Sequence, residues 1–81
     1  MWVLYILSLD NKYLYTGITN DLENRLRQHK NGQSKFTKRF KEIELIYTEN
    51  FETKTEAVKR EREIKGWSRK KKIEKLGLPS S

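Results

Sequence analysis

The fold is decided by residues 13–29, which read YLYTGITNDLENRLRQH. The first part of this stretch is rich in aromatic and β-branched residues, a composition that predicts a β-strand. Asn20 or Asp21 then offers a side-chain oxygen that can cap a helix, and Asn31-Gly32 provides a stop signal for that helix. A strand that leads directly into a short helix is therefore the starting point for the rest of the chain.

A second strand is predicted immediately before this segment. Trp2–Leu9 has a similar composition of aromatic, aliphatic and β-branched residues, and residues 10–12 read Asp-Asn-Lys, which is typical of a turn. Two such runs joined by a short turn predict a β-hairpin. The hairpin would be the framework on which the helices pack.

The length of the hairpin loop decides whether two tyrosines share a face. A two-residue loop would put Tyr5 and Tyr15 on opposite faces of the sheet. A three-residue loop pairs Leu9 with Tyr13 and Tyr5 with Gly17, so that Tyr5 and Tyr15 become diagonal neighbours on one face. We predict the three-residue loop, with Gly17 leaving open space over a shared site. The commoner role of strand tyrosines is to pack on a core, and this remains the alternative.

Downstream, the pattern predicts one more strand and two more helices. Ile43–Tyr47 resembles a third strand, and Gln33–Lys41 before it is a loop or a short helix. A capping box at Thr53 and Glu56 opens a helix that Gly66 ends. Ser68 caps a last helix through about Leu76.

The predicted order of elements is β-β-α-β-α-α. This order defines an α+β fold, with a small three-stranded antiparallel sheet flanked by helices. We assign residues 1–77 to a single domain and residues 78–81 to a short C-terminal tail.

Composition restricts the class of protein. The chain has 81 residues and no cysteine, which excludes a disulfide framework and fits a reducing compartment. Its apolar N-terminus is far shorter than the ~20 residues that a membrane span needs, and it lacks the basic start of a signal peptide. We expect a soluble cytoplasmic protein, associated at most with the nucleoid and not with a membrane.

The charge is positive and unevenly distributed. Lys and Arg total 18 against 11 Asp and Glu, for a net charge of +7. Residues 25–41 hold seven bases and no acid, and residues 59–81 hold nine bases and three glutamates. Displacing counterions from phosphates favours binding of such segments to DNA or RNA. The alternative is a solvated basic surface without a partner.

Polar residues interrupt the apolar faces of two predicted helices. At about 100° per residue, Arg25 and His29 stack beside Leu22 and Leu26. Burying a guanidinium or an imidazole costs free energy unless it is paired. A functional cleft would explain the pair, and the alternative is an Arg that extends to solvent beside a surface His.

The second helix contains a similar interruption. Ala57 and Ile64 define its inner face, and Glu61 lies between them. A carboxylate in this position usually has a cation partner or a metal ion. The structural alternative is a salt bridge from Glu61 to Arg25 or to a nearby Lys. Three polar side chains on inner faces together suggest a cleft.

Five segments, in order along the chain, resemble the motifs of the GIY-YIG nuclease superfamily, particularly its small stand-alone bacterial-type members. They are Leu4-Tyr5-Ile6 and Tyr15-Thr16-Gly17 at the two triplets, Asp21–His29 at the helix motif, Lys35–Arg39 at the basic-aromatic stretch, and Glu56–Trp67 at the segment with the metal-binding glutamate. Each segment alone is weakly specific. In order and at this spacing they cover about residues 2–75, nearly the whole chain.

The resemblance implies a DNA endonuclease, a metal-dependent hydrolase of phosphodiester bonds of the kind used in DNA repair or recombination. Glu61 would hold one Mg²⁺ or Mn²⁺ ion, with water and phosphate oxygens completing its shell. Tyr5 would help to deprotonate or position the attacking water. Arg25 would neutralise charge on the transition state, and Tyr15 and His29 would orient water or phosphate.

The basic segments supply the expected contacts to nucleic acid. Phe36 or Trp67 could stack on a base, although we favour Trp67 as a core anchor because it follows the inner face of the second helix. No separate DNA-recognition segment is visible, so sequence-specific targeting would need a partner protein. The residues expected to contact nucleic acid are Lys35, Phe36, Lys38, Arg39, Arg69, Lys70, Lys71 and Lys72.

Two other functions compete with the endonuclease. One is a DNA- or RNA-binding module that keeps the fold without catalysis, and the other is a basic scaffold for an acidic protein. A salt-dependent affinity for nucleic acid would separate the first two functions from the third. Glu61 favours the endonuclease, because binding phosphates requires basic side chains and not a carboxylate.

Overall fold

The computed structural model describes residues 1–32 and 37–79, and it has the predicted element order β-β-α-β-α-α. The elements are β1 (Trp2–Leu9), β2 (Tyr13–Thr19), α1 (Leu22–Lys30), β3 (Ile43–Phe51), α2 (Lys54–Lys65) and α3 (Arg69–Leu76). The α+β fold class is therefore confirmed. Within these ranges, no helix has the length and apolar character required to cross a membrane.

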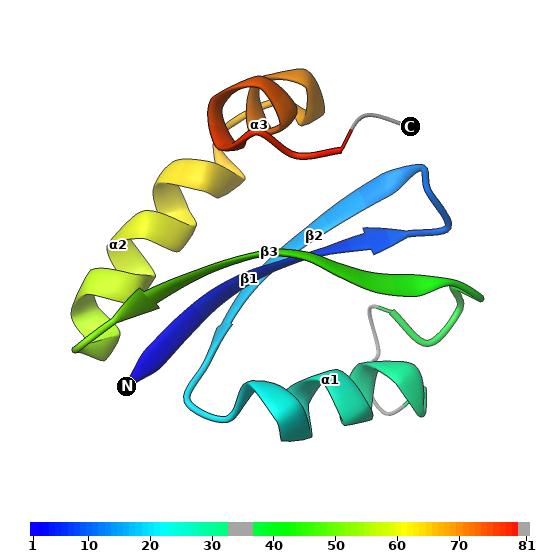
Figure 1. Cartoon of the computed structure of the whole chain (residues 1–81), viewed down its shortest axis with the longest axis horizontal. Helices are drawn as coiled ribbons and strands as arrows, with labels where there is room; N and C mark the ends of the chain where they lie inside the picture. The colour runs from blue at the N-terminus through cyan, green and yellow to red at the C-terminus, as the bar shows by residue number, and fades with distance from the viewer. Residues whose placement is uncertain (33–36, 80–81) are drawn as a thin grey trace.

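The sheet is antiparallel with the strand order β2-β1-β3. Its central strand β1 is covered on both faces, which explains why Trp2–Leu9 is almost continuously apolar. Figure 1 shows α1 on one side of the sheet and α2 with α3 on the other. The two faces therefore have separate cores.

The first core, which we call the α1 core, contains the buried residues Tyr5, Leu7 and Leu9, with Leu22 and Leu26 of α1 packed against them. The second, the α2 core, contains Leu4, Ile6, Ile64 and Leu78. Alternate residues of β1 point to opposite faces, so Tyr5 lies on the α1 side and its neighbours Leu4 and Ile6 lie on the α2 side.

The hairpin has the predicted three-residue loop. Leu9 pairs with Tyr13 and Tyr5 pairs with Gly17. Asp10 and Asn11 have φ angles of 52° and 56°, a left-handed conformation that Asp and Asn tolerate better than other non-glycine residues. The Asp10 carboxylate also accepts hydrogen bonds from the backbone N–H groups of residues 41 and 42, at 3.0 and 2.7 Å. Asp10 thus joins the hairpin turn to the start of β3.

Each predicted helix cap is present. Asp21 accepts a hydrogen bond from the N–H of residue 24 at the start of α1, Thr53 from that of Glu56 at the start of α2, and Ser68 from that of residue 71 at the start of α3. These bonds satisfy backbone donors that the first turn of a helix leaves unpaired.

Two boundaries differ from those predicted. β3 continues to Phe51, which pairs with Trp2, whereas the sequence predicts an end at Tyr47. The additional residues alternate polar and apolar along an edge strand, so their composition resembles a loop. Leu78, assigned to the tail, is 6% exposed and belongs to the α2 core. Gly77 turns the chain back in a left-handed conformation, and the N–H of Leu78 bonds to the carbonyl of residue 73 at 3.1 Å.

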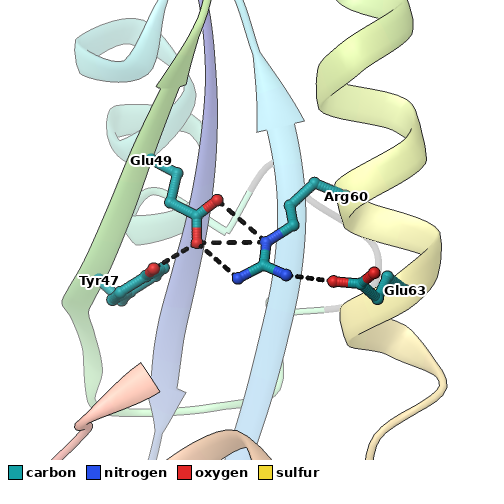
Figure 2. A network of polar contacts seen from close by, with 4 residues as sticks. All are labelled: Tyr47, Glu49, Arg60 and Glu63. Atoms are coloured by element: carbon teal, nitrogen blue, oxygen red, sulfur yellow. Dashed lines mark hydrogen bonds and ion pairs between the residues drawn. The ribbon is translucent and has the colours of Figure 1, made fainter. Parts of the chain in front are cut away.

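A polar network crosses the α2 face of the sheet (Figure 2). Arg60 of α2 donates hydrogen bonds from Nε to both carboxylate oxygens of Glu49 on β3, at 3.1 and 3.3 Å. Tyr47 bonds to the same carboxylate, and Glu63 pairs with the other side of the guanidinium. The Arg60 guanidinium also lies 5.4 Å from the centre of the Trp67 ring. The network therefore fixes α2 against β3, the edge strand on the opposite side of β1 from β2.

Candidate active site

Tyr5 and Tyr15 lie on the same face of the hairpin, as the predicted register requires. Their ring centres are 6.2 Å apart and the rings are tilted by 37°. The space above Gly17 is not open as predicted, because the Tyr5 ring fills it. A Cβ atom at position 17 would lie 2.6 Å from Tyr5 Oη and 3.1 Å from a ring carbon of Tyr15. Glycine is therefore needed at this position for close approach of the tyrosines.

His29 links Tyr5 to a residue of the following loop. Its Nε2 atom lies 3.0 Å from Tyr5 Oη and its Nδ1 atom lies 2.8 Å from Thr37 Oγ1. The imidazole is 0% exposed, and its ring centre is 5.2 Å from that of Tyr15. A surface histidine is therefore excluded. His29 is the middle member of a buried chain of polar groups, Tyr5–His29–Thr37.

Arg25 approaches the same phenol from one turn earlier in α1. Its Nε–H donates to Tyr5 Oη at 3.4 Å, and Nη1 donates to Gln28 Oε1 at 2.9 Å. The side chain is half-buried. The hydrogen bond to Tyr5 raises the pKa of Arg25, so the group stays a cation. Because residues four apart stack on one side of a helix, α1 directs both Arg25 and His29 to Tyr5.

The protonation states follow from burial. Desolvation raises the pKa of Tyr5 to about 12, although the hydrogen bond from Arg25 opposes the rise. Burial lowers the pKa of His29, and the positive charge of Arg25 lowers it further. At neutral pH the pair is therefore a neutral phenol against a neutral imidazole, with one fixed cation beside them.

The lowered pKa of His29 predicts a pH-dependent stability. The folded protein binds the His29 proton less well than the unfolded chain, whose His pKa is about 6.5, so stability is lost as the pH falls below that value. His29 is the chain's single histidine, and its ring signals in a proton NMR titration are unambiguous. We expect a midpoint below about 6.5 and a free energy of unfolding that falls between pH 7.5 and pH 5. A midpoint at or above 6.5 would contradict the buried pairing.

Glu61 lies apart from these four residues. It is on α2, which covers the opposite face of the sheet from α1, and its side chain is 18% exposed. One carboxylate oxygen is 3.2 Å from Lys65 Nζ, one turn later in the same helix. Of the two structural alternatives, the ion pair with a nearby Lys is therefore the one present. Among the described residues, no hydrogen bond or ion pair joins Glu61 to Arg25 or His29, and the single cleft expected from the three inward polar residues stays a prediction.

The donor groups around Glu61 restrict the kind of metal site that is feasible. Within the described parts of the chain there is no group of three or more His, Cys, Asp or Glu that could hold a metal ion. A single carboxylate fits a Mg²⁺ or Mn²⁺ ion whose other positions are filled by water and phosphate oxygens. One carboxylate is too few ligands for a metal site in which the protein supplies the whole coordination shell. Lys65 is paired with Oε2 of Glu61, and Oε1 is the oxygen that could hold the cation.

The predicted nucleic-acid contacts fall into different environments. Trp67 packs against the α2 core, as favoured, and Lys71 Nζ lies 5.2 Å from its ring centre. Lys38 and Lys70 are exposed. Lys35 and Phe36 lie outside the described residues. The remaining three, Arg39, Arg69 and Lys72, come from two separate basic segments and line one cavity.

The sequence pattern does not predict the roles of two polar residues in this region. Thr37 is 0% exposed and holds Nδ1 of His29, and Gln28 holds the Arg25 guanidinium. The signal for Gln28 was its spacing of three residues from Arg25 on a helix. Thr37 comes from a loop, and no periodicity predicts which loop residue turns inward.

The chain matches a known domain family and several related proteins. A family model described as the GIY-YIG catalytic domain matches residues 1–74. A UPF0213 protein from Staphylococcus saprophyticus is 48% identical over 71 residues, which are 86% of this chain and 87% of that protein. A UPF0213 protein from Staphylococcus aureus is 44% identical over 71 residues, with the same coverage of 86% and 87%.

The fold of a relative is also known. The solution NMR structure of a UPF0213 protein from Bacillus halodurans superposes with a TM-score of 0.63 at 34% identity, covering 100% of this chain and 88% of that one. The domain type implies a nuclease-type function related to nucleic acids. The chain belongs to the GIY-YIG domain family and, within it, to the UPF0213 proteins.

Proposed function

We propose that the protein is a DNA endonuclease that hydrolyses phosphodiester bonds with the help of one divalent metal ion. The observation that carries the proposal is the contact between Tyr5 Oη and His29 Nε2, with the Arg25 guanidinium on the same oxygen. Binding a phosphate backbone requires exposed cations. A buried phenol–imidazole pair adds a route for a proton, which hydrolysis needs and binding does not.

The hydrogen bonds suggest the direction of that route. Arg25 can only donate, so the Tyr5 oxygen accepts from Arg25 and its own proton is available to His29 Nε2. Nδ1–H of His29 then donates to Thr37 Oγ1. With a pKa of about 12, Tyr5 is not a phenolate at neutral pH. It therefore acts as a base only by passing its proton to His29 as it takes one from the attacking water.

Arg25 and Tyr15 are the members of the site that can contact a phosphate. Both are half-buried, whereas Tyr5 is 1% exposed, so the attacking water would reach Tyr5 Oη only by entering between Arg25 and Tyr15. The guanidinium of Arg25 would neutralise the charge that develops on the phosphate oxygens in the transition state. Tyr15 would orient the phosphate or the water by hydrogen bonding. His29 contributes from behind the phenol, as a proton acceptor.

Glu61 would hold the metal ion, Mg²⁺ or Mn²⁺. When bound, such an ion polarises a phosphate oxygen and lowers the pKa of its bound water. α1 and α2 cover opposite faces, and α2 packs along β2, the edge strand that carries Tyr15 and Gly17. A phosphate that contacts both Arg25 and the Glu61 metal ion would have to reach both faces of the sheet, and β2 is the edge strand that carries Tyr15 and packs against α2.

A binding module without catalysis is the second candidate function. The burial of Tyr5 and the ion pair between Glu61 and Lys65 favour it, because both describe satisfied groups that do not need a substrate. The basic segments would then bind DNA or RNA without cutting. Either function predicts an affinity for nucleic acid that falls as the salt concentration rises.

The test is cleavage of labelled single-stranded, duplex, flapped and branched DNAs, and of matched RNAs, with Mg²⁺, with Mn²⁺ or with EDTA. We expect cutting of at least one DNA with metal ion and none with EDTA. Salt-dependent binding to the same panel with no cutting under any condition would favour the binding module. Cutting that continues in EDTA would contradict the role of the metal ion.

A further inference from the structure

A cavity of about 560 Å³ lies at the hairpin end of the sheet, and four basic residues from three parts of the chain line it. Arg39 comes from the loop before β3, and Lys12 is in the hairpin turn. Arg69 and Lys72 come from α3. No acidic residue is among the described residues that line this cavity. Burial lowers the pKa of Lys72, and the nearby charge of Lys65 on α2 lowers it further.

Two aromatic rings form one wall of the same cavity. Tyr13 and Phe40 have ring centres 5.7 Å apart, and the Arg39 guanidinium lies 5.2 Å from the centre of the Phe40 ring. Tyr13 is 58% exposed, an unusual degree for a large aromatic side chain at the start of a strand. The cavity therefore has an accessible aromatic face beside a concentration of positive charge.

This combination is complementary to a nucleotide. Phosphate oxygens match arginine and lysine donors, and every base has a flat face that can stack on an aromatic ring. The volume lies in the ordinary range for small-ligand sites. Inside a duplex a base has both faces covered by its neighbours, whereas an unpaired base can turn one face to the Tyr13 ring.

The cavity lies beside the candidate active site along the same strand. Tyr13 and Tyr15 are two residues apart on β2, and therefore on one face and about 7 Å apart. Bases stacked in a duplex rise about 3.4 Å each and an unpaired strand is more extended, so this separation corresponds to one or two nucleotides. We propose that the cavity binds an unpaired nucleotide one or two positions from the phosphate held at Arg25 and Tyr15, with its base on Tyr13 and its phosphate on Arg39, Arg69 and Lys72.

The inference rests on the part of the proposed function that makes nucleic acid the ligand. It does not depend on the protein cutting that ligand. It predicts that the protein binds a duplex with a short single-stranded overhang more tightly than a blunt duplex of equal charge. The ring of Tyr13 and the basic side chains of Arg69 and Lys72 on α3 would produce this difference in affinity.

The test is fluorescence anisotropy with labelled DNAs in EDTA, so that cutting plays no part. Tyr13→Ala is expected to weaken binding of the overhang DNA by roughly 5- to 100-fold, the range for one base stacked on one ring. Binding of the blunt duplex should change by less than about twofold, and Tyr13→Phe, which keeps the ring, should bind like wild type.

A matched pair of variants separates the cavity from charge in general. Arg69→Ala/Lys72→Ala removes two charges from the cavity, and Lys59→Ala/Lys75→Ala removes two exposed charges of α2 and α3 that do not line it. The first pair should weaken binding of the overhang DNA far more than the second. Equal losses from both pairs, or an equal effect of Tyr13→Ala on both DNAs, would overturn the inference and leave the proposed function standing. A wild-type protein that binds no nucleic acid would overturn both the inference and the proposed function.

Discussion

Replacing Arg25 by alanine is expected to slow cutting by about 100- to 1,000-fold, the usual cost of removing one donor that stabilises transition-state charge. The guanidinium holds the Tyr5 oxygen and is itself held by Gln28, so it is already oriented before a phosphate arrives. Arg25→Lys keeps the charge but loses the planar set of donors, and we expect it to recover only a small part of the rate. The measurement is the single-turnover rate on the best DNA of the panel.

Arg27 provides the control for this experiment. It lies in the same helix and carries the same charge, but its side chain is 62% exposed and forms a surface ion pair with Glu23 at 3.7 Å. Arg27→Ala should cut within about threefold of wild type, because exposed ion pairs contribute little. If the two variants lost activity equally, Arg25 would be one of many nonspecific contacts and not part of the site.

Gly17→Ala is expected to produce the largest loss of stability among alanine substitutions of the four glycines. The new Cβ atom would lie 2.6 and 2.7 Å from the Oη and Cζ atoms of Tyr5, so the buried ring must move. Overpacking of this kind costs about 1–3 kcal/mol, which for a domain of this size lowers the melting temperature by roughly 5–20 °C. Movement of Tyr5 should also break its bond to His29 and raise the His29 midpoint in an NMR titration.

Gly66→Ala is the matched substitution. Gly66 ends α2 with φ −77°, and the nearest atom to an added Cβ is a backbone oxygen at 3.5 Å, an ordinary contact. We expect a melting temperature within about 3 °C of wild type, because alanine fits this helical conformation without strain. A Gly17→Ala protein as stable as Gly66→Ala would show that the Tyr5 ring is not held against Gly17.

Local signals allowed most of the fold to be predicted. The caps at Asp21, Thr53 and Ser68 each depend on one side chain and the N–H groups of the next turn, so the local sequence is enough to locate them. The hairpin register follows from the loop length and from Gly17. Arg25 and His29 meet at Tyr5 because the helical period places residues four apart together.

Properties that depend on packing between distant segments could not be predicted in the same way. The polar end of β3 is a strand because it pairs with β1, and nothing local distinguishes it from a loop. A helical wheel shows that Glu61 belongs to the inner side of α2 without showing which face of the sheet α2 covers. The inward position of Thr37 and the reach of Arg60 to Glu49 likewise depend on the complete fold.

The predicted functional residues therefore fall into two groups in the fold. Tyr5, Tyr15, Arg25 and His29 form one contact cluster on the α1 face. Glu61 lies on α2, which covers the other face, and in the proposed function a substrate phosphate joins it to them. The proposed chemistry depends on this arrangement, since a nucleic-acid strand would bring the metal ion and the basic site together.

The most direct test of this account is the rate of metal-dependent DNA cutting by wild type, Glu61→Ala and Glu74→Ala. Glu74 is an exposed carboxylate on α3 and controls for the loss of one negative charge. The account predicts that Glu74→Ala cuts like wild type, and that Glu61→Ala folds and binds the same DNA but cuts at least about 100-fold more slowly, with partial rescue at high Mn²⁺. Equal cutting by all three proteins would contradict the assignment of the metal ion to Glu61 and the site built on it.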